Sequence, residues 1–374
     1  MLTLVGNGWH PWLFREETKS LMGEIEVIHP RVVSIPFQEN TNSRISRAAL
    51  IDDVLENPAS LIINEGTTSS QIGEAISEWS SEFMGPGTFA VRSRSIGIGI
   101  DGISSKDIEM EVGARISSRK NIVDLGEPEI EISVVVAGQT EGEAHPDPLG
   151  EAKSVVVWGI RNSEWERENY SGRSPTDRPF FKPVSLEPRQ ARLLISLGHR
   201  PGREVREVVD PFCGTGGIVI EAALQGLGVL ASDLDSRMVD GTRKNLDWVG
   251  ADHRVEKCNA SEIGSLWGTR SDCVFAFDPP YGRSSWKSED GLDLFLSALS
   301  SAREVDPQGV ISTMLPTGPE VLSQSLEEEF TVMGKKWSEL EELITQRGWR
   351  VALKSPIKVH RSLARMVIVC HPLD

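Results

Sequence analysis

The residues with the clearest chemical potential form the tetrapeptide Asp278-Pro279-Pro280-Tyr281, which directly follows a predicted strand, 272–277. An exocyclic amine on an aromatic base is a poor nucleophile, because its lone pair is drawn into the ring. The Asp278 carboxylate and the Pro279 carbonyl can accept its two N–H protons and direct the lone pair at an electrophile. The two prolines, Pro279 and Pro280, stiffen the turn and so limit misplacement of the reacting groups, and Tyr281 offers a stacking face for an extruded base. These four candidate catalytic residues predict chemistry at an exocyclic amine, without separating guanine N2 from adenine N6 or cytosine N4.

A second chemical signal is the loop Asp210-Pro-Phe-Cys-Gly-Thr-Gly-Gly217, between a predicted strand, 205–209, and a predicted helix, 217–224. Glycines at such a turn allow positive φ and close approach of a ligand, and the amides of a helix N-terminus favour an anionic group. The loop is not G-x-G-x-x-G, and Asp210 at its mouth would repel a pyrophosphate but can hold an ammonium group. Asp233, at the end of the next strand, can accept both ribose hydroxyls of an adenosine. Together these features favour S-adenosylmethionine over NAD.

The predicted cofactor site spans three successive strand ends. Asn259 follows the third strand, where an adenine amino group would lie, although a loop Asn without any ligand explains it equally well. No metal site is predicted, because the four cysteines form no C-x-x-C pair and have no nearby histidine partner. The candidate cofactor-binding residues are Asp210, Phe212, Cys213, Gly214, Thr215, Gly216, Asp233, Leu234, Asn259 and Ala260.

Periodicity along the chain predicts two architectures. From residue 189 strands alternate with helices, the pattern of a Rossmann-like doubly wound α/β sheet, in which Ser236 would cap a helix over 237–249. The first 160 residues mix helices, as at 10–22, with short strands, as at 2–6, 25–36 and 88–96, an α+β pattern. The segment 161–188 is rich in Arg, Pro, Gly and aromatic residues, and its prolines exclude regular helix. We therefore expect domains at 1–65, 66–160 and 189–374, with 161–188 as a linker.

Composition limits the classes of function. The chain carries 39 Lys and Arg against 55 Asp and Glu, a net charge of −16, whereas nucleic-acid-binding surfaces are basic. Net charge averages over surfaces that never meet a ligand. Two segments are locally basic, with nine basic and five acidic residues over 161–203 and eight and three over 335–365; solvated faces would explain them as well. Apolar runs stay far below the roughly 18–20 residues of a membrane span, and no secretory pattern opens the chain. We therefore expect the protein to reside in the cytoplasm, where cysteines stay reduced.

These motifs resemble those of Rossmann-like amino-group methyltransferases. More narrowly, the chain resembles the archaeal tRNA (guanine-10-N2) methyltransferase family, which carries an N-terminal THUMP domain. Asn259 departs from the family, where many relatives have Asp, and this weakens the adenine contact assigned to it. The resemblance includes Thr88-Phe-Ala-Val-Arg92 and Val123-Asp-Leu-Gly-Glu-Pro128 in the first half, Arg178-Pro-Phe-Phe-Lys-Pro-Val-Ser-Leu-Glu-Pro-Arg189, both motifs described above, and Val359-His-Arg-Ser-Leu-Ala-Arg365.

The resemblance implies a fold, an activity and a partner. The fold would be a class I S-adenosylmethionine-dependent methyltransferase domain behind a ferredoxin-like and THUMP region. The activity would be methylation, once or twice, of the N2 amino group of guanosine 10 in tRNA, and the family's THUMP module grips the acceptor end of tRNA. We expect tRNA as partner, S-adenosylmethionine as cofactor, and a cytoplasmic monomer without metal or membrane contact.

Two alternatives stay open. The same chemistry could act on another tRNA position, on ribosomal RNA or on DNA, although the THUMP-like strands argue against DNA. A protein of another class, a non-catalytic tRNA-binding protein with a vestigial catalytic domain, is the second alternative. The presence together of Asp210, Asp233 and Asp278 argues against it.

Overall fold

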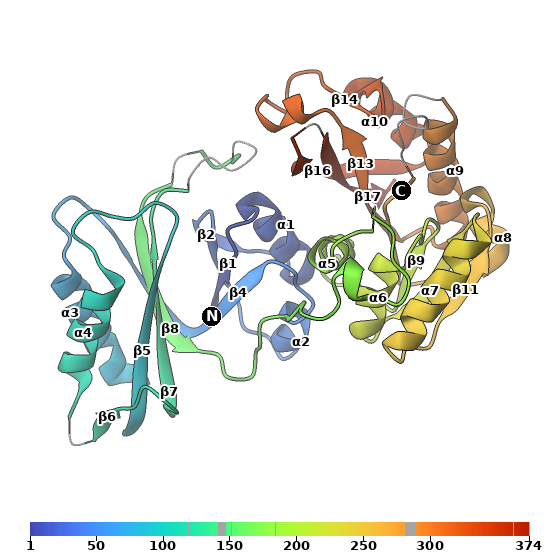
Figure 1. The fold of residues 1–374 in the computed structure, drawn as a ribbon. Coiled ribbons are helices and arrows are strands. Elements are labelled where there is room, and N and C mark those ends of the chain that lie inside the picture. Colours follow the sequence, from blue (N-terminus) through green and yellow to red (C-terminus); the bar gives the residue numbers. More distant parts are fainter. Residues whose placement is uncertain are drawn as a thin grey trace. The chain divides into compact units, whose positions relative to one another are not determined.

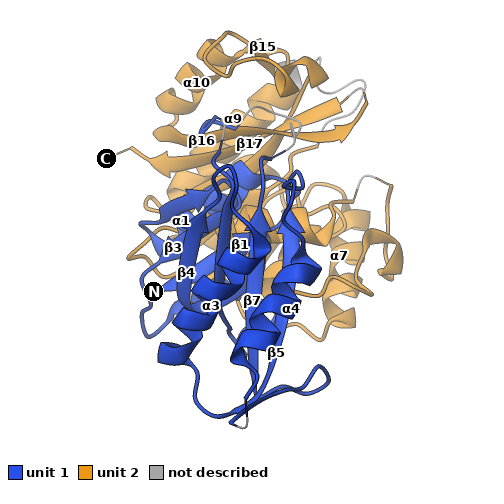
Figure 2. Ribbon diagram, turned by 90° about the vertical axis from the view of Figure 1, so that its left-hand side faces the viewer, with its two compact units in different colours: residues 1–46, 50–143, 147–167 blue, residues 47–49, 144–146, 168–374 orange. Residues whose placement is uncertain are grey.

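The computed structural model describes residues 1–118, 120–140, 147–150, 152–183, 185–280, 289–361 and 363–373. Two compact units are coloured separately in Figure 2. The N-terminal unit comprises residues 1–46, 50–143 and 147–167, and the C-terminal unit comprises residues 47–49, 144–146 and 168–374. The step from one unit to the next at residues 167 and 168 lies inside the segment predicted as a linker. The division into four parts stays a prediction.

The N-terminal unit is built on a mixed sheet that has eight strands within the described residues (Figure 1). The strand order is β2-β3-β1-β4-β8-β7-β5-β6. β5 runs parallel to β6 and β7, and the other neighbours are antiparallel. This confirms the predicted α+β character. The elements are β1 (Leu2–Gly6), α1 (Pro11–Met22), β2 (Glu26–His29), β3 (Val32–Ile35), α2 (Thr41–Ile45), β4 (Ile51–Ile62), α3 (Ser69–Phe83), β5 (Gly87–Ile96), α4 (Ser105–Ile116), β6 (Asn121–Val123), β7 (Ile130–Ala137) and β8 (Val155–Arg161).

Two strand predictions in this unit need correction. The single strand predicted over 25–36 is a hairpin of β2 and β3, with Pro30, which has no N–H to donate, at its turn. The sequence analysis places no strand over 51–62, where β4 lies. The register between β4 and β8 shifts between Glu56 and Ala59, a bulge of the kind that tolerates proline. β4 pairs with β1 and with β8, so one sheet runs through both predicted N-terminal domains.

Helices α3 and α4 cover one face of this sheet. Thr68 caps α3 in a reciprocal pair of hydrogen bonds with Gln71, a capping box that satisfies two free helix amides. Ile72 and Ile76 of α3 pack with Ile108 of α4 in one buried cluster with residues of β5, β7 and β8. Burial of this apolar stripe, rather than helix propensity, holds the two helices on the sheet.

The C-terminal unit contains the predicted doubly wound sheet (Figure 1). Strands β11, β10, β9, β12 and β13 are adjacent in that order and parallel. β17 adds antiparallel to β13, and β16 pairs with β17. Helices α5 to α7 form one layer and α8 to α10 the other. The elements are α5 (Pro188–Leu197), β9 (Glu207–Asp210), α6 (Gly217–Leu224), β10 (Gly228–Asp233), α7 (Ser236–Trp248), β11 (Arg254–Lys257), α8 (Ile263–Trp267), β12 (Cys273–Phe277), α9 (Glu289–Val305), β13 (Val310–Thr317), β14 (Thr331–Val332), β15 (Lys335–Lys336), α10 (Trp337–Gln346), β16 (Trp349–His360) and β17 (Leu363–Pro372).

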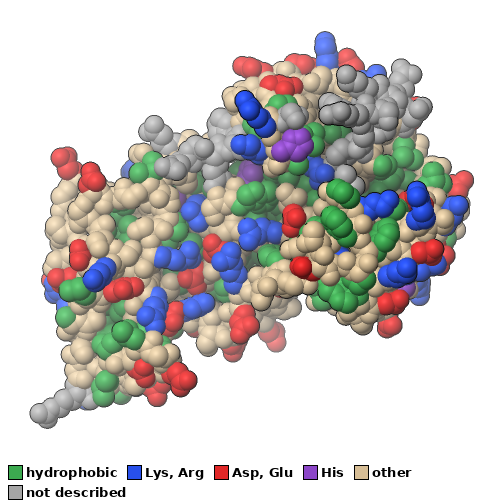
Figure 3. Space-filling model, viewed as in Figure 1, with side chains coloured by type: hydrophobic (Ala, Val, Ile, Leu, Met, Phe, Trp, Pro, Cys, Tyr) green, Lys and Arg blue, Asp and Glu red, His purple; other side chains and the backbone are tan. Residues whose placement is uncertain are grey.

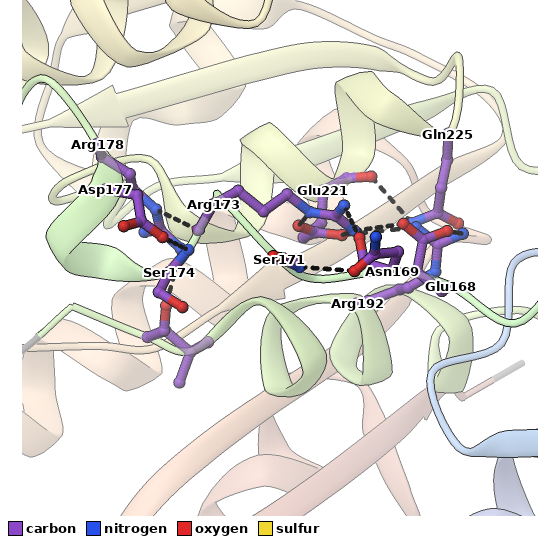
Figure 4. A network of polar contacts seen from close by, with 11 residues as sticks. Glu168, Asn169, Ser171, Arg173, Ser174, Asp177, Arg178, Arg192, Glu221 and Gln225 are labelled. Carbon is purple, nitrogen blue, oxygen red and sulfur yellow. Dashed lines mark hydrogen bonds and ion pairs between the residues drawn. The ribbon is translucent and has the colours of Figure 1, made fainter.

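The residues from Glu168 onward in the predicted linker pack against α6 through a buried ionic network (Figure 4). Glu221 of α6 accepts from Arg173 at 2.7 Å and lies 3.5 Å from Arg192, and its side chain is 1% exposed. Glu168 pairs with the same two arginines. Within the described residues the segment contains one short 3-10 turn, Pro175–Asp177, and no α-helix before Pro188. Buried charges of this kind hold a segment in place only when every partner is present.

Replacing Glu221 by Ala should lower the free energy of unfolding by about 3–5 kcal/mol, because two arginines would lose their fully buried partner and keep only the half-buried Glu168. Guanidinium-induced unfolding measures this loss. A matched control is Glu204→Ala, which removes an acid that is 65% exposed and paired with Arg206. That exposed pair contributes less than about 1 kcal/mol. Equal stabilities for the two variants would contradict the importance of the network.

Candidate active site

Three aspartates lie at the carboxyl edge of the parallel sheet. Asp210 is the last residue of β9 and Asp233 the last residue of β10, while Asp278 directly follows β12. β9 lies between β10 and β12. Because parallel strands end at the same edge, the three carboxylates come from adjacent strands at one site, as open α/β sheets arrange their ligand sites.

The glycine loop after β9 forms a tight turn into α6. Gly214 and Gly216 have φ values of 52° and 81°, a left-handed conformation that glycine adopts at little cost. A Cβ on Gly216 would also lie 3.0 Å from the side chain of Thr242. That threonine donates to the Gly214 carbonyl at 2.9 Å. The turn therefore requires glycine at these positions, and it leads from Asp210 into the first turn of α6.

The Asp233 carboxylate is oriented by two backbone amides. One oxygen accepts from Gly214 N and the other from Asp235 N, both at 2.9 Å. Burial raises the pKa of Asp233. Asp235, not the predicted Ser236, caps α7 through Arg237 N, and its ion pair with the exposed Arg237 lowers the pKa of Asp235 to about 2. Asp233 thus binds the glycine loop, while Asp235 caps α7.

One pocket is lined by both motifs, because the glycine loop and Asp278 border the same hollow. The predicted cofactor residues Asp210, Phe212, Cys213, Gly214 and Thr215 line it. The same hollow is lined by residues that the sequence analysis did not select, namely Lys182, Ser185, Leu186, Gly217, Ile218 and Met238.

The first three of these additional residues come from the predicted linker. The Thr215 hydroxyl lies 2.8 Å from the Ser185 hydroxyl. Asn245 of α7 accepts from Phe180 N and donates to the carbonyls of Phe180 and Thr215, all at 2.8 Å. This segment therefore forms a wall of the pocket. The only sequence signal for it was the run from Arg178 to Arg189, which entered through the family resemblance.

The remaining predicted cofactor residues, Asp233 included, are not among those that line this pocket. Gly216 is the N-cap residue of α6, and Leu234 is 65% exposed. Asn259 uses its side chain to accept from Ser261 N at 3.1 Å, and Ala260 is buried. This local cap agrees with the second interpretation of Asn259, as a loop residue that binds no ligand. A role for these residues stays a prediction.

Asp278 forms an ion pair that the sequence analysis did not identify. Its Oδ2 lies 3.0 Å from Nη1 of Arg365 on β17, and the two side chains are only 16% and 11% exposed. Pro279 is buried and Pro280 is exposed. Tyr281, the fourth predicted catalytic residue, lies outside the described residues. Nothing in local periodicity relates residues 278 and 365, because their contact depends on β17 lying next to β13.

Two carboxylates, Asp210 and Asp278, and one lysine, Lys182, line the pocket. Burial raises the pKa of Asp210 well above the usual range, and the charges of Asp233 and Asp278 raise it further, although a hydrogen bond from Phe212 N opposes the shift. The Asp210 carboxylate, which has no cationic partner in the described part of the chain, therefore favours a cationic group of a ligand over an anionic one. Among the described residues no group of three or more His, Cys, Asp or Glu could hold a metal ion. No helix within the described ranges is long and apolar enough to cross a membrane.

Comparison with known proteins connects this geometry to a family. A family model described as an RMKL-like methyltransferase domain matches residues 175–346, and a THUMP domain model matches residues 67–140. A tRNA (guanine(10)-N2)-dimethyltransferase of Pyrococcus abyssi is 32% identical over 67% of this chain and 69% of its own length. One of the same name from Methanothermobacter thermautotrophicus is 31% identical over 75% and 72%. The chain belongs to this tRNA (guanine(10)-N2)-dimethyltransferase family.

Membership confirms the resemblance found in the sequence and the methyltransferase character of the Rossmann-like sheet. The RMKL-like match begins at residue 175, so it includes much of the segment that walls the pocket. A more distant likeness is to the crystal structure of TrmN from Thermus thermophilus, which is 20% identical with a TM-score of 0.48 and covers 100% of this chain and 99% of that chain.

Replacing Arg365 by Met should lower the turnover of methyl transfer, because the Asp278 carboxylate would lose both its ionic partner and its fixed orientation. The loss should be smaller than the roughly 10²–10³-fold expected for removing a direct electrostatic stabiliser. Arg365→Lys, which keeps the charge without the planar fork, should recover part of the rate. Wild-type turnover in the Met variant would contradict this role.

Proposed function

We propose that the protein transfers a methyl group from S-adenosylmethionine to the exocyclic N2 amino group of guanosine 10 in tRNA. One observation carries the chemistry: the glycine loop and Asp278 line a single pocket. A cofactor held by the loop would then lie beside the group that receives the substrate amine. The family to which the chain belongs supports the choice of tRNA and of guanine N2.

The residues that line the pocket, with the neighbouring Asp233, fit S-adenosylmethionine, which supplies an electrophilic methyl group on a sulfonium centre. Asp210, buried and beside two further carboxylates, suits the cofactor's ammonium group. Asp233, oriented by amides of Gly214 and Asp235, suits the ribose hydroxyls. The left-handed turn at Gly214 keeps side-chain atoms away from the ligand. The carboxylates are therefore matched to a cation that carries a nucleoside.

Asp278 and the Pro279 carbonyl receive the substrate. Each can accept one N–H of the planar amine, which turns the nitrogen lone pair toward the methyl group. Positive charge develops on that nitrogen during transfer, so a fixed carboxylate stabilises it. Arg365 holds Asp278 in one orientation through the 3.0 Å ion pair. Stacking of the extruded base on Tyr281 stays part of the prediction from sequence.

The N-terminal unit, where the THUMP model matches, would bind the tRNA. On the face drawn in Figure 3, cationic side chains lie among acidic ones rather than forming one continuous basic surface. Binding must therefore use local groups of cations, as the net charge of −16 also requires. Guanosine 10 would leave its stack to reach the pocket, at a cost of a few kcal/mol that contacts elsewhere on the tRNA offset.

Mass spectrometry of nucleosides tests the proposal directly. Unmodified tRNA incubated with the protein and S-adenosylmethionine should yield N2-methylguanosine, N2,N2-dimethylguanosine or both, mapped to position 10. A tRNA with adenosine at that position should yield neither. Asp278→Ala should lower turnover by about 10²–10³-fold, as expected for one electrostatic stabiliser. Recovery of N6-methyladenosine, or of methylated guanosine at another position as the main product, would refute the assignment.

Cofactor affinity should depend on pH through Asp210. The carboxyl must be ionised to bind an ammonium group, and its raised pKa keeps it protonated at a higher pH than an ordinary aspartate. Affinity should therefore fall as pH is lowered, beginning well above the usual aspartate pKa of about 3.9. Asp210→Asn should bind weakly and lose this dependence. Titration calorimetry at several pH values measures both, and a wild-type affinity independent of pH would contradict the role of Asp210.

A further inference from the structure

The hairpin of β16 and β17 extends beyond the catalytic edge of the sheet. β17 runs antiparallel to β13, with Ala364 paired to Thr317, the last residue of β13. The turn between β16 and β17 therefore lies at the carboxyl ends of the parallel strands, the edge that carries Asp278. Lys358 pairs with Ala364 and His360 with Leu363, so these residues lie at or beyond the end of β13.

The outer end of this hairpin is exposed and basic. From Lys354 to Arg365 the sequence contains four Lys or Arg residues and one His, with no Asp or Glu. Ile357 and Ala364 are buried, whereas Lys358, Val359, His360 and Arg361 are exposed. The chain as a whole has a net charge of −16, whereas this stretch at the catalytic edge is locally positive because it contains no acids.

The cations of this tip differ from two other arginines of the same unit, Arg237 and Arg243, which have acidic partners. Arg237 lies 2.8 Å from Asp235, and Arg243 has Asp240 and Glu256 as ionic partners. Lys358 and Arg361 form no ion pair with any other residue that the structure describes. Their charges are therefore presented to solvent. A phosphodiester backbone is the partner whose charge such a tip complements.

Arg365 fixes the tip relative to the reacting group. It pairs with Pro316 in the sheet register and lies 3.0 Å from Asp278. At about 3.3 Å per residue along a strand, the tip lies on the order of 10 Å beyond Arg365. This places exposed cations beside the position that the target nucleoside would occupy.

We propose that Lys358 and Arg361, at the tip of the β16–β17 hairpin, bind the RNA backbone next to the methylated nucleoside. This inference rests on the proposed function, which supplies RNA as the substrate. The hairpin would position the strand around the target base, while the N-terminal unit holds the body of the tRNA. Binding through phosphates carries no sequence information by itself, so the contact sets position rather than choice of neighbouring bases.

The test is the salt dependence of tRNA binding by the full chain. Lys358→Ala/Arg361→Ala removes two cations at the catalytic edge and leaves Arg365 and Asp278 unchanged. Arg206→Ala/Arg350→Ala removes two exposed cations near the opposite edge, at the amino ends of the parallel strands. Both variants change the net charge equally. Affinity for unmodified tRNA is measured by fluorescence anisotropy over a range of salt, and affinity for S-adenosylmethionine by calorimetry.

The hairpin variant should bind tRNA more weakly, and the slope of log K against log salt should become shallower by about 1 for each phosphate that the protein no longer neutralises, about 2 in all. Its affinity for S-adenosylmethionine should equal that of the wild type, and the control variant should keep the wild-type slope. An unchanged slope in the hairpin variant, or the same change in both variants, overturns this proposal while wild-type methylation stands. Failure of the wild type to bind or methylate tRNA instead refutes the proposed function, and this inference with it.

Discussion

The active site depends on holding three carboxylates close together at one edge of the parallel sheet, two of them in the pocket. Coulomb repulsion and burial both disfavour three ionised carboxylates at one site. Each aspartate is stabilised by different partners. Asp233 accepts two backbone amides, and Asp278 pairs with a guanidinium. Asp210 accepts a hydrogen bond from Phe212 N, yet its pKa remains strongly raised. Of the three, Asp210 is the one whose ionisation would gain most from a cationic ligand.

This constraint explains why residues far apart in sequence meet at the pocket. The glycine loop orients Asp233 through Gly214, and Asn245 ties that loop to the segment around Phe180. The same segment is held on α6 by the ionic network around Glu221. A loop with two left-handed glycines has little stiffness of its own. Its geometry is therefore set by the elements packed around it.

Sequence patterns predicted the parts of the site that are local. The alternation of strands and helices indicated the doubly wound sheet, and the topology rule for such sheets put residues 210 and 278 at one edge. Arg365 and Ser185 were not predicted because their roles arise from pairing and packing between distant segments. β4 was not predicted because a bulge at Asn57 and Pro58 breaks its alternation. Asn259 was ambiguous because capping and ligand binding use the same side-chain oxygen.

The acidic composition and an RNA substrate are compatible once charge is considered locally. The acids that matter for catalysis lie in a pocket that receives a cation, where negative charge is favourable. The backbone of an RNA strand must avoid that pocket and meet cations beside it. The β16–β17 hairpin combines the two kinds of cation within one short stretch. Arg365 at its base pairs with Asp278, and Lys358 and Arg361 at its tip are exposed. A net charge summed over the whole chain cannot reveal this separation, since it depends on which strand ends share an edge.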